Sequence, residues 1–200
     1  MKAETLIKDP VFQLNLLLWM AKEQPKGYYR VRPFFYEQHY EIVYVEQPFD
    51  FPEEIHRGIT AFDKGVSVEP EPELILGRRN DGKALYFEAK ADSFSVESTN
   101  CKQARGHLLA TGPAFGEVFH TLHDCLLCYV LPNDKTALMS ECLSSLQGEL
   151  RQGGLNPGKC SVHGLSITGT NLFYSWDANF KHHAGVLEDS IEVISDLDED

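Results

Sequence analysis

The chain has 200 residues, of which 42% are hydrophobic and 24% are charged, and its formal net charge at pH 7 is −12. This length and composition predict a single soluble globular domain with a substantial core, and they exclude fibrous and wholly disordered proteins. No apolar run is long enough to span a bilayer, and the amino terminus lacks the basic region of a secretory signal. We therefore expect an intracellular protein, cytoplasmic or nuclear, without a membrane partner and with its five cysteines as reduced thiols.

The acidic charge is unevenly distributed along the chain. A uniformly acidic protein is a poor ligand for nucleic acid, because phosphates are bound by Lys and Arg. Seven acidic residues follow Lys181 with no Lys or Arg among them, so residues 1–181 carry a net charge of only −5. Residues 78–105 carry a net positive charge. A locally basic site on an acidic body is compatible with a nucleic-acid enzyme.

The amino-terminal part of the chain predicts a helix, a strand and a second helix. Residues 10–24 read as a buried helix that opens at Asp9-Pro10, an N-cap followed by proline in the first turn. Residues 28–45 are aromatic and β-branched, and "YEIVYV" (40–45) alternates well enough to predict a strand. The tyrosines of this segment are expected to fill the core and the sheet. Residues 50–62 have apolar side chains at helical spacing and predict a short helix.

A β-hairpin follows. The segment "VEPEPELILG" (68–77) enters a strand after its prolines, and "ALYFEAK" (84–90) forms the next one. Asp81-Gly82 between them is a strong hairpin signal.

The second half alternates helices and strands. Ser and Thr before residue 100, Gly112 and Gly153-Gly154 mark helix boundaries, and apolar runs mark strands. The predicted elements are a helix at 100–111, a strand at 125–131, a helix at 134–153, and strands at 160–169 and 171–177. This order predicts an α/β fold with a mixed central β-sheet flanked by helices.

We expect the folded domain to span residues 1–182 and to be followed by an acidic, disordered tail, 183–200. Little apolar area remains there to offset the entropy of ordering. Within the tail, Ile191, Val193 and Ile194 are followed by acids and resemble a SUMO-interacting motif, in which an extended segment adds to the edge of a partner's sheet. The tail is thus a candidate binding segment for a protein partner.

Two carboxylates and a lysine are brought together by the predicted hairpin. Glu88 and Lys90 lie on one face of a strand, with Ala89 on the other. Glu73 on the adjacent strand can join them. Mg²⁺ and Mn²⁺ prefer oxygen ligands, so Glu73, Glu88 and the backbone carbonyl of Ala89 are candidate metal ligands. An acid inside an apolar strand requires a partner or a metal, which favours a functional site over a solvated hairpin face.

At these residues the chain resembles the PD-(D/E)XK nuclease superfamily. The resemblance rests on Pro72-Glu73, the strand and turn after it, and Glu88-Ala89-Lys90. It implies a restriction-endonuclease-like fold and a Mg²⁺- or Mn²⁺-dependent endonuclease or exonuclease that hydrolyses phosphodiester bonds in DNA. Glu73, Glu88 and Lys90 would be catalytic, and Gln103 stands where some members of the superfamily place a glutamine facing the site.

The resemblance also implies further contacts. Many members of the superfamily supply another acid from a preceding helix, a place that Glu53 or Glu54 could take. Many nucleases of this type cut two strands as homodimers, so a homodimer is a candidate assembly. The candidate phosphate-binding residues are Arg78, Arg79, Lys102 and Arg105.

The chain departs from the family pattern at one position. Glu73 follows Pro72 where the first motif usually ends in Asp, and one extra methylene shifts the ligand by about an ångström. A catalytically inactive module of the same fold, which binds nucleic acid or a partner protein within a larger assembly, is therefore the alternative function.

A zinc site is a third hypothesis. Cys125-x2-Cys128 and Cys160-x2-His163 have ligand types and spacings that zinc could use. Residues three apart on the predicted strand at Cys125 point to opposite faces, however, and buried free cysteines commonly act as small hydrophobes.

Overall fold

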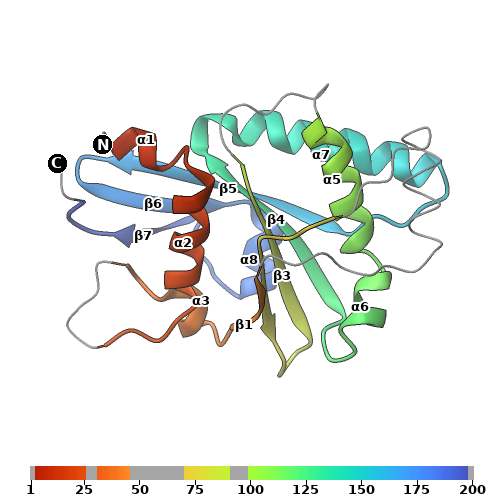
Figure 1. The fold of residues 1–200 in the computed structure, drawn as a ribbon, viewed down its shortest axis with the longest axis horizontal. Helices are drawn as coiled ribbons and strands as arrows, with labels where there is room; N and C mark the ends of the chain where they lie inside the picture. Colours follow the sequence, from red (N-terminus) through yellow and green to blue (C-terminus); the bar gives the residue numbers. More distant parts are fainter. Residues whose placement is uncertain (1–2, 26–30, 46–69, 91–98, 198–200) are drawn as a thin grey trace.

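The computed structural model describes residues 3–25, 31–45, 70–90 and 99–197, with residues 99–102 described by their backbone alone. Seven strands form one mixed sheet with helices on both faces (Figure 1). The predicted α/β class is therefore confirmed. In the described part of the chain, no helix is long and apolar enough to cross a membrane.

The strands lie in the sheet in the same order as in the chain. The first three are antiparallel, the third to fifth are parallel, and the last three are again antiparallel. The strands are β1 (Glu41–Val45), β2 (Leu74–Arg78), β3 (Lys83–Ala89), β4 (Asp124–Pro132), β5 (Lys159–Thr168), β6 (Asn171–Trp176) and β7 (Ser190–Ile194).

The helices fall into two groups because parallel strands need crossover connections. Both crossovers advance the sheet in the same direction, and connections of one hand then place their helices on one face. The crossover helices are α5 (Thr99–Ala110) and α6 (Ala114–Val118), between β3 and β4, and the 3₁₀ turn η1 (Asn133–Lys135) with α7 (Thr136–Gln152), between β4 and β5. The other helices are α1 (Ala3–Leu6), α2 (Pro10–Met20), α3 (Phe34–Glu37) and α8 (Ala178–Ala184). Of these, α2, α3 and α8 pack on the opposite face.

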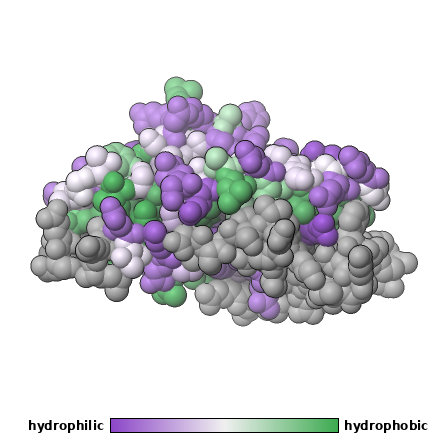
Figure 2. Space-filling view, turned by 90° about the horizontal axis from the view of Figure 1, so that it is seen from above, coloured by the Kyte–Doolittle hydropathy of each residue, from purple (hydrophilic) through white to green (hydrophobic). Residues whose placement is uncertain are grey.

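Strand β3 shows how the sheet separates two cores. Leu85 and Phe87 pack with α2, α3 and α8, while Tyr86 packs with α5 and α7 on the other face. Glu88 follows Tyr86 in the alternation and therefore lies on the α5 side. The face shown in Figure 2 carries only small hydrophobic areas between hydrophilic residues, as expected when most apolar side chains are in these cores.

The β2–β3 hairpin has the predicted turn. Arg78 pairs with Lys83 at its closed end, and Gly82 has a positive φ of 69°. A Cβ atom on Gly82 would lie 2.0 Å from the His123 ring, so both backbone geometry and close packing require glycine there.

Of the amino-terminal predictions, one is corrected and one is confirmed. Asp9 caps α2 by accepting a hydrogen bond from the Val11 N–H at 2.9 Å, as expected, but the helix ends at Met20 rather than at residue 24. The strand predicted at residues 40–45 is confirmed as β1, and Phe34 and Phe35 before it belong to helix α3 and are buried in the core. The helix predicted at 50–62 lies outside the described residues.

The prediction of a disordered tail from residue 183 is wrong for most of that segment. Strand β7 pairs with β6, and Ile191, Val193 and Ile194 are buried in the core. Alternation explains the error, because the strand hides its apolar face while its acids point outward. These three side chains are occupied in the protein's own sheet, which also removes the SUMO-interacting interpretation. Residues 198–200 lie outside the described residues.

Two buried histidines, His163 and His183, form hydrogen bonds with residues from other segments of the chain. The His163 ring is fully buried and bonds the Tyr174 hydroxyl and, at 3.0 Å, Ser161 Oγ. The His183 ring lies 3.1 Å from the Tyr40 hydroxyl and 2.9 Å from the Asp124 carbonyl oxygen. Burial lowers the pKa of His163 to about 3 and that of His183 to about 4.

These depressed pKa values predict acid sensitivity above pH 4. Below pH 6.5 each histidine takes up a proton in the unfolded chain but stays neutral in the folded one, so the unfolded state binds more protons. The free energy of unfolding should therefore fall as the pH drops from 6.5 toward 4, by up to about 1.4 kcal/mol per pH unit for each histidine.

Urea unfolding at pH 7, 6 and 5 measures this slope. His163→Gln should remove roughly half of it, since one of the two groups no longer titrates. An equal slope in the wild type and the variant would contradict the assignment.

Candidate functional site

A pocket of about 460 Å³ lies where β2 begins and β3 ends, next to α5. The sequence predicted that Glu73, Glu88, Lys90 and Gln103 converge, and all four line this pocket. They come from three separate segments of the chain. The lining residues are Glu71, Pro72, Glu73, Glu88, Lys90, Gln103 and His107.

Glu73 is held against the end of β3 from two sides. Its backbone N–H donates to the Phe87 carbonyl at 3.2 Å, which extends the hairpin ladder by one bond. Its side-chain Oε2 accepts a hydrogen bond from the Ala89 N–H at 3.0 Å. The first acid of the predicted pair is thus fixed at the mouth of the hairpin.

Glu88 is the buried acid of the site, with only 4% of its surface exposed. The Lys90 ammonium donates to Oε1, while Oε2 lies 3.6 Å from His107 Nε2. Among the described residues Oε2 has no hydrogen-bond partner. Burial alone would raise the pKa of Glu88, but His107 and Lys90 more than offset it and hold this pKa below its usual value. Glu88 is therefore a carboxylate at neutral pH.

His107 is the residue that sequence reasoning missed. It is 1% exposed, and its Nδ1 lies 2.7 Å from the Tyr86 hydroxyl. Burial raises the pKa of Tyr86 well above its usual value, so this hydroxyl keeps its proton and can donate to Nδ1. The other ring nitrogen, Nε2, faces Oε2 of Glu88, a carboxylate oxygen that can only accept. The available signal was the four-residue spacing from Gln103, which puts both side chains on one face of α5.

Gln103 faces the site as expected. Its Oε1 lies 3.5 Å from Lys90 Nζ, at the long end of hydrogen bonding. Lys90 therefore has carbonyl and carboxylate oxygens on two sides, and its side chain is only 15% exposed.

The predicted phosphate contact Arg78 is engaged elsewhere. It lies at the closed end of the hairpin, opposite the end where the pocket opens. Its Nη2 is 2.9 Å from Asp81 Oδ2 and 2.9 Å from the His183 carbonyl, and its guanidinium lies 4.8 Å from the centroid of the Tyr40 ring. This side chain joins the hairpin to the core.

Arg79 and Arg105 are also away from the pocket. Arg79 is 72% exposed at the hairpin turn, and Arg105 Nη2 lies 2.7 Å from Glu149 on α7. Neither lines the pocket. The side chain of Lys102 and both Glu53 and Glu54 lie outside the described residues.

The pocket contains two carboxylates, the type of ligand that hard divalent cations prefer. Within the described ranges, no group of three or more His, Cys, Asp or Glu side chains could hold a metal ion. Mg²⁺ needs only one or two carboxylates, with waters and substrate phosphates filling the other positions. Glu73 and Glu88 supply two carboxylates, and the buried Oε2 of Glu88 has no hydrogen-bond partner in the part of the chain that the structure describes.

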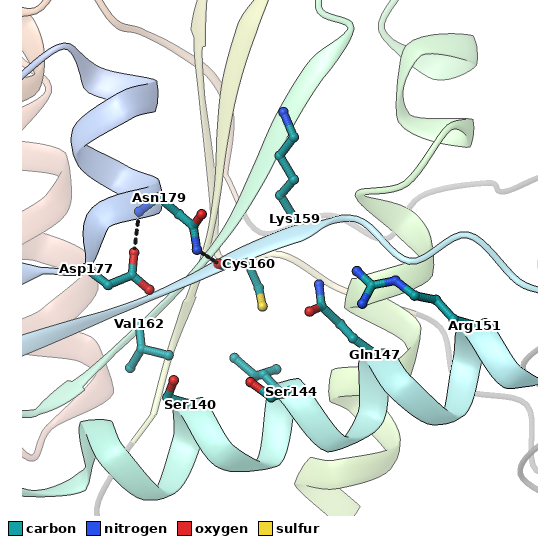
Figure 3. Close-up of a pocket in the computed structure, with 10 residues that line it drawn as sticks. Ser140, Ser144, Gln147, Arg151, Lys159, Cys160, Val162, Asp177 and Asn179 are labelled. Atoms are coloured by element: carbon teal, nitrogen blue, oxygen red, sulfur yellow. Dashed lines mark hydrogen bonds between the residues drawn. The ribbon is translucent and has the colours of Figure 1, made fainter.

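A second pocket, of about 230 Å³, lies between α7 and the start of β5 (Figure 3). Cys160 points its thiol into it, but burial raises the pKa of this thiol to about 11. The acidic residue that lines this pocket, Asp177, caps α8 by accepting a hydrogen bond from the Asn179 N–H at 2.9 Å. No histidine lines this pocket among the described residues, so it lacks the base that a cysteine nucleophile requires.

The zinc hypothesis is not supported by the positions of its ligands. Cys125 and Cys128 belong to the cores on opposite faces of the sheet, as the strand alternation predicted. His163 is fully buried and uses both ring nitrogens in hydrogen bonds.

Removing the Lys90 ammonium should destabilise the fold, because the buried Glu88 carboxylate then lacks its ion-pair partner. We expect Lys90→Met to lower the free energy of unfolding at pH 7 by about 3 kcal/mol, because one partner of a buried charge pair is lost. The double variant Glu88→Gln/Lys90→Met should recover most of this loss. Urea unfolding measures all three proteins, with Lys135→Met on η1 as the surface control. Equal losses in Lys90→Met and Lys135→Met would contradict a buried pair.

Comparison with known proteins adds no family assignment, since no family model, no curated protein and no solved structure matches the chain. What the site does is therefore argued from its geometry.

Proposed function

We propose that this protein is a metal-dependent nuclease that hydrolyses phosphodiester bonds in DNA. The single observation that carries the proposal is the convergence of Glu73, Glu88, Lys90 and Gln103 on one pocket. Two carboxylates, an ammonium and an amide at one sheet end are the groups that such chemistry uses.

The order of elements around the pocket supports a restriction-endonuclease-like core. Strands β1, β2 and β3 form an antiparallel meander, α5 follows, and β4 lies parallel to β3. The two acids lie at the start of β2 and the end of β3, as the resemblance to PD-(D/E)XK nucleases implies.

Each side chain has a part in the proposed reaction. Glu73 and Glu88, with the Ala89 carbonyl, would hold Mg²⁺ or Mn²⁺. The metal, when bound, neutralises phosphate charge and lowers the pKa of a bound water. Lys90 orients the attacking water, and Gln103 restrains the Lys90 ammonium.

Two further buried groups prepare the second acid. Tyr86 orients the His107 ring, which faces Oε2 of Glu88. A carboxylate held ionised and oriented before the metal arrives needs less rearrangement to bind it. His107 thereby extends the site beyond the residues of the motif.

The alternative is an inactive module of the same fold that binds nucleic acid or a partner protein. One observation favours it: Glu73 already accepts from Ala89, and Glu88 already pairs with Lys90. Two carboxylates that already have these partners would stabilise the hairpin without a metal. Metal binding separates the two functions.

Thermal melting with millimolar Mn²⁺ is the deciding measurement. A ligand at about 100 times its Kd stabilises the folded state by about 2.7 kcal/mol, which for this size of protein raises Tm by about 5–10 °C. We expect that shift in the wild type and in Glu141→Gln, an exposed acid on α7 used as the charge control. Glu88→Gln should lose it.

Cleavage of plasmid DNA completes the test. Lys90→Met should retain the Mn²⁺ shift but cut at least about 100-fold more slowly, since it keeps the acids and loses the group that orients water. A wild type without a Mn²⁺ shift would overturn the nuclease and favour the inactive module.

A further inference from the structure

We propose that Gln13 of α2 is a positioning residue for Lys90, and the catalytic part of this inference rests on the proposed nuclease function. Gln13 lies 77 residues before Lys90 and on the opposite face of the sheet from α5. It is not part of the motif, and it does not line the pocket.

The contact is a pair of hydrogen bonds from a fully buried amide. Gln13 Nε2 donates to the Lys90 carbonyl at 3.1 Å and to the Ile7 carbonyl at 2.7 Å. A side-chain amide has two N–H donors, and each is directed to one of these oxygens. The bonds tie the chain before α2 to the residue that follows β3.

The Lys90 backbone needs this donor because it lies beyond the end of the strand. Strand β2 reaches no further along β3 than Phe87, apart from the Glu73 bonds. On the other side, the Lys90 N–H donates to the Val130 carbonyl of β4 at 2.9 Å. Gln13 supplies the donor for the Lys90 carbonyl. Both polar backbone groups of Lys90 are then held, which fixes where its side chain starts.

The choice of residue favours a positioning role over simple packing. The other buried residues of α2 include Leu16, Leu17 and Met20, and an apolar side chain would suit the same environment. Gln13 instead leaves its Oε1 buried without a hydrogen-bond partner among the described residues. An unsatisfied buried acceptor is unfavourable. The Nε2 of this amide holds the backbone from which the Lys90 side chain reaches Glu88 and Gln103.

Gln13→Met tests the inference, because methionine keeps length and helix propensity and removes both donors. Gln24→Met is the matched control: Gln24 is also a buried glutamine whose Nε2 donates to a backbone carbonyl, that of Trp19 at 2.9 Å, away from the pocket. Plasmid cleavage with Mn²⁺ should show kcat at least tenfold lower in Gln13→Met, with KM changed less than twofold. Gln24→Met should match the wild type, and equal kcat in all three proteins would overturn the proposal.

Amide hydrogen exchange at Lys90 gives a second readout that needs no activity. In the wild type, Lys90 should exchange as slowly as the interior of β3, and Gln13→Met should raise its rate at least tenfold without altering β4. Fast exchange at Lys90 in the wild type would overturn the inference even if the variant failed to fold. A wild type with a protected Lys90 but no cleavage would instead refute the nuclease and leave the anchoring by Gln13 standing.

Discussion

The buried charge of Glu88 is the constraint on which the site depends. A carboxylate at this depth is costly to bury unless opposite charge and hydrogen bonds compensate it. Lys90, two residues further along the chain, forms an ion pair with Oε1 of Glu88. His107 of α5 faces the other carboxylate oxygen, Oε2. Tyr86 in turn holds His107. The acid therefore organises a strand, a helix and the residue after the strand into one polar cluster inside an apolar interface.

The end of β3 beside this cluster is held by hydrogen bonds from three other segments of the chain. Glu73 binds the Ala89 N–H from the hairpin, Val130 accepts from Lys90 on the other side, and Gln13 donates from the opposite face of the sheet. Hydrogen bonds from three directions therefore restrain the last residue of β3 and the residue that follows it. Such support is what a site needs when small displacements reduce its chemistry.

Local rules could predict the hairpin and the shared face of Glu88 and Lys90. A turn signal at Asp81-Gly82 and the two-residue period of a strand are properties of a few neighbouring residues. The same rules failed for β7, where a run of acids concealed buried Ile191 and Val193. They also did not assign Arg78, whose charge suggested phosphate and whose contacts with Asp81 and the His183 carbonyl are structural.

The sequence by itself determined the α/β class, the hairpin, and the four residues Glu73, Glu88, Lys90 and Gln103 as one candidate set. The class, the hairpin and the shared face of Glu88 and Lys90 depend on periodicity and turn chemistry over short distances, whereas Gln103 was implied by the resemblance to the nuclease superfamily. Only the tertiary structure decided which distant groups complete the set, His107 beside Glu88 and Gln13 beneath Lys90. The reason is that buried polar groups take their partners from whatever elements pack against them, and packing brings together residues that sequence separation does not relate.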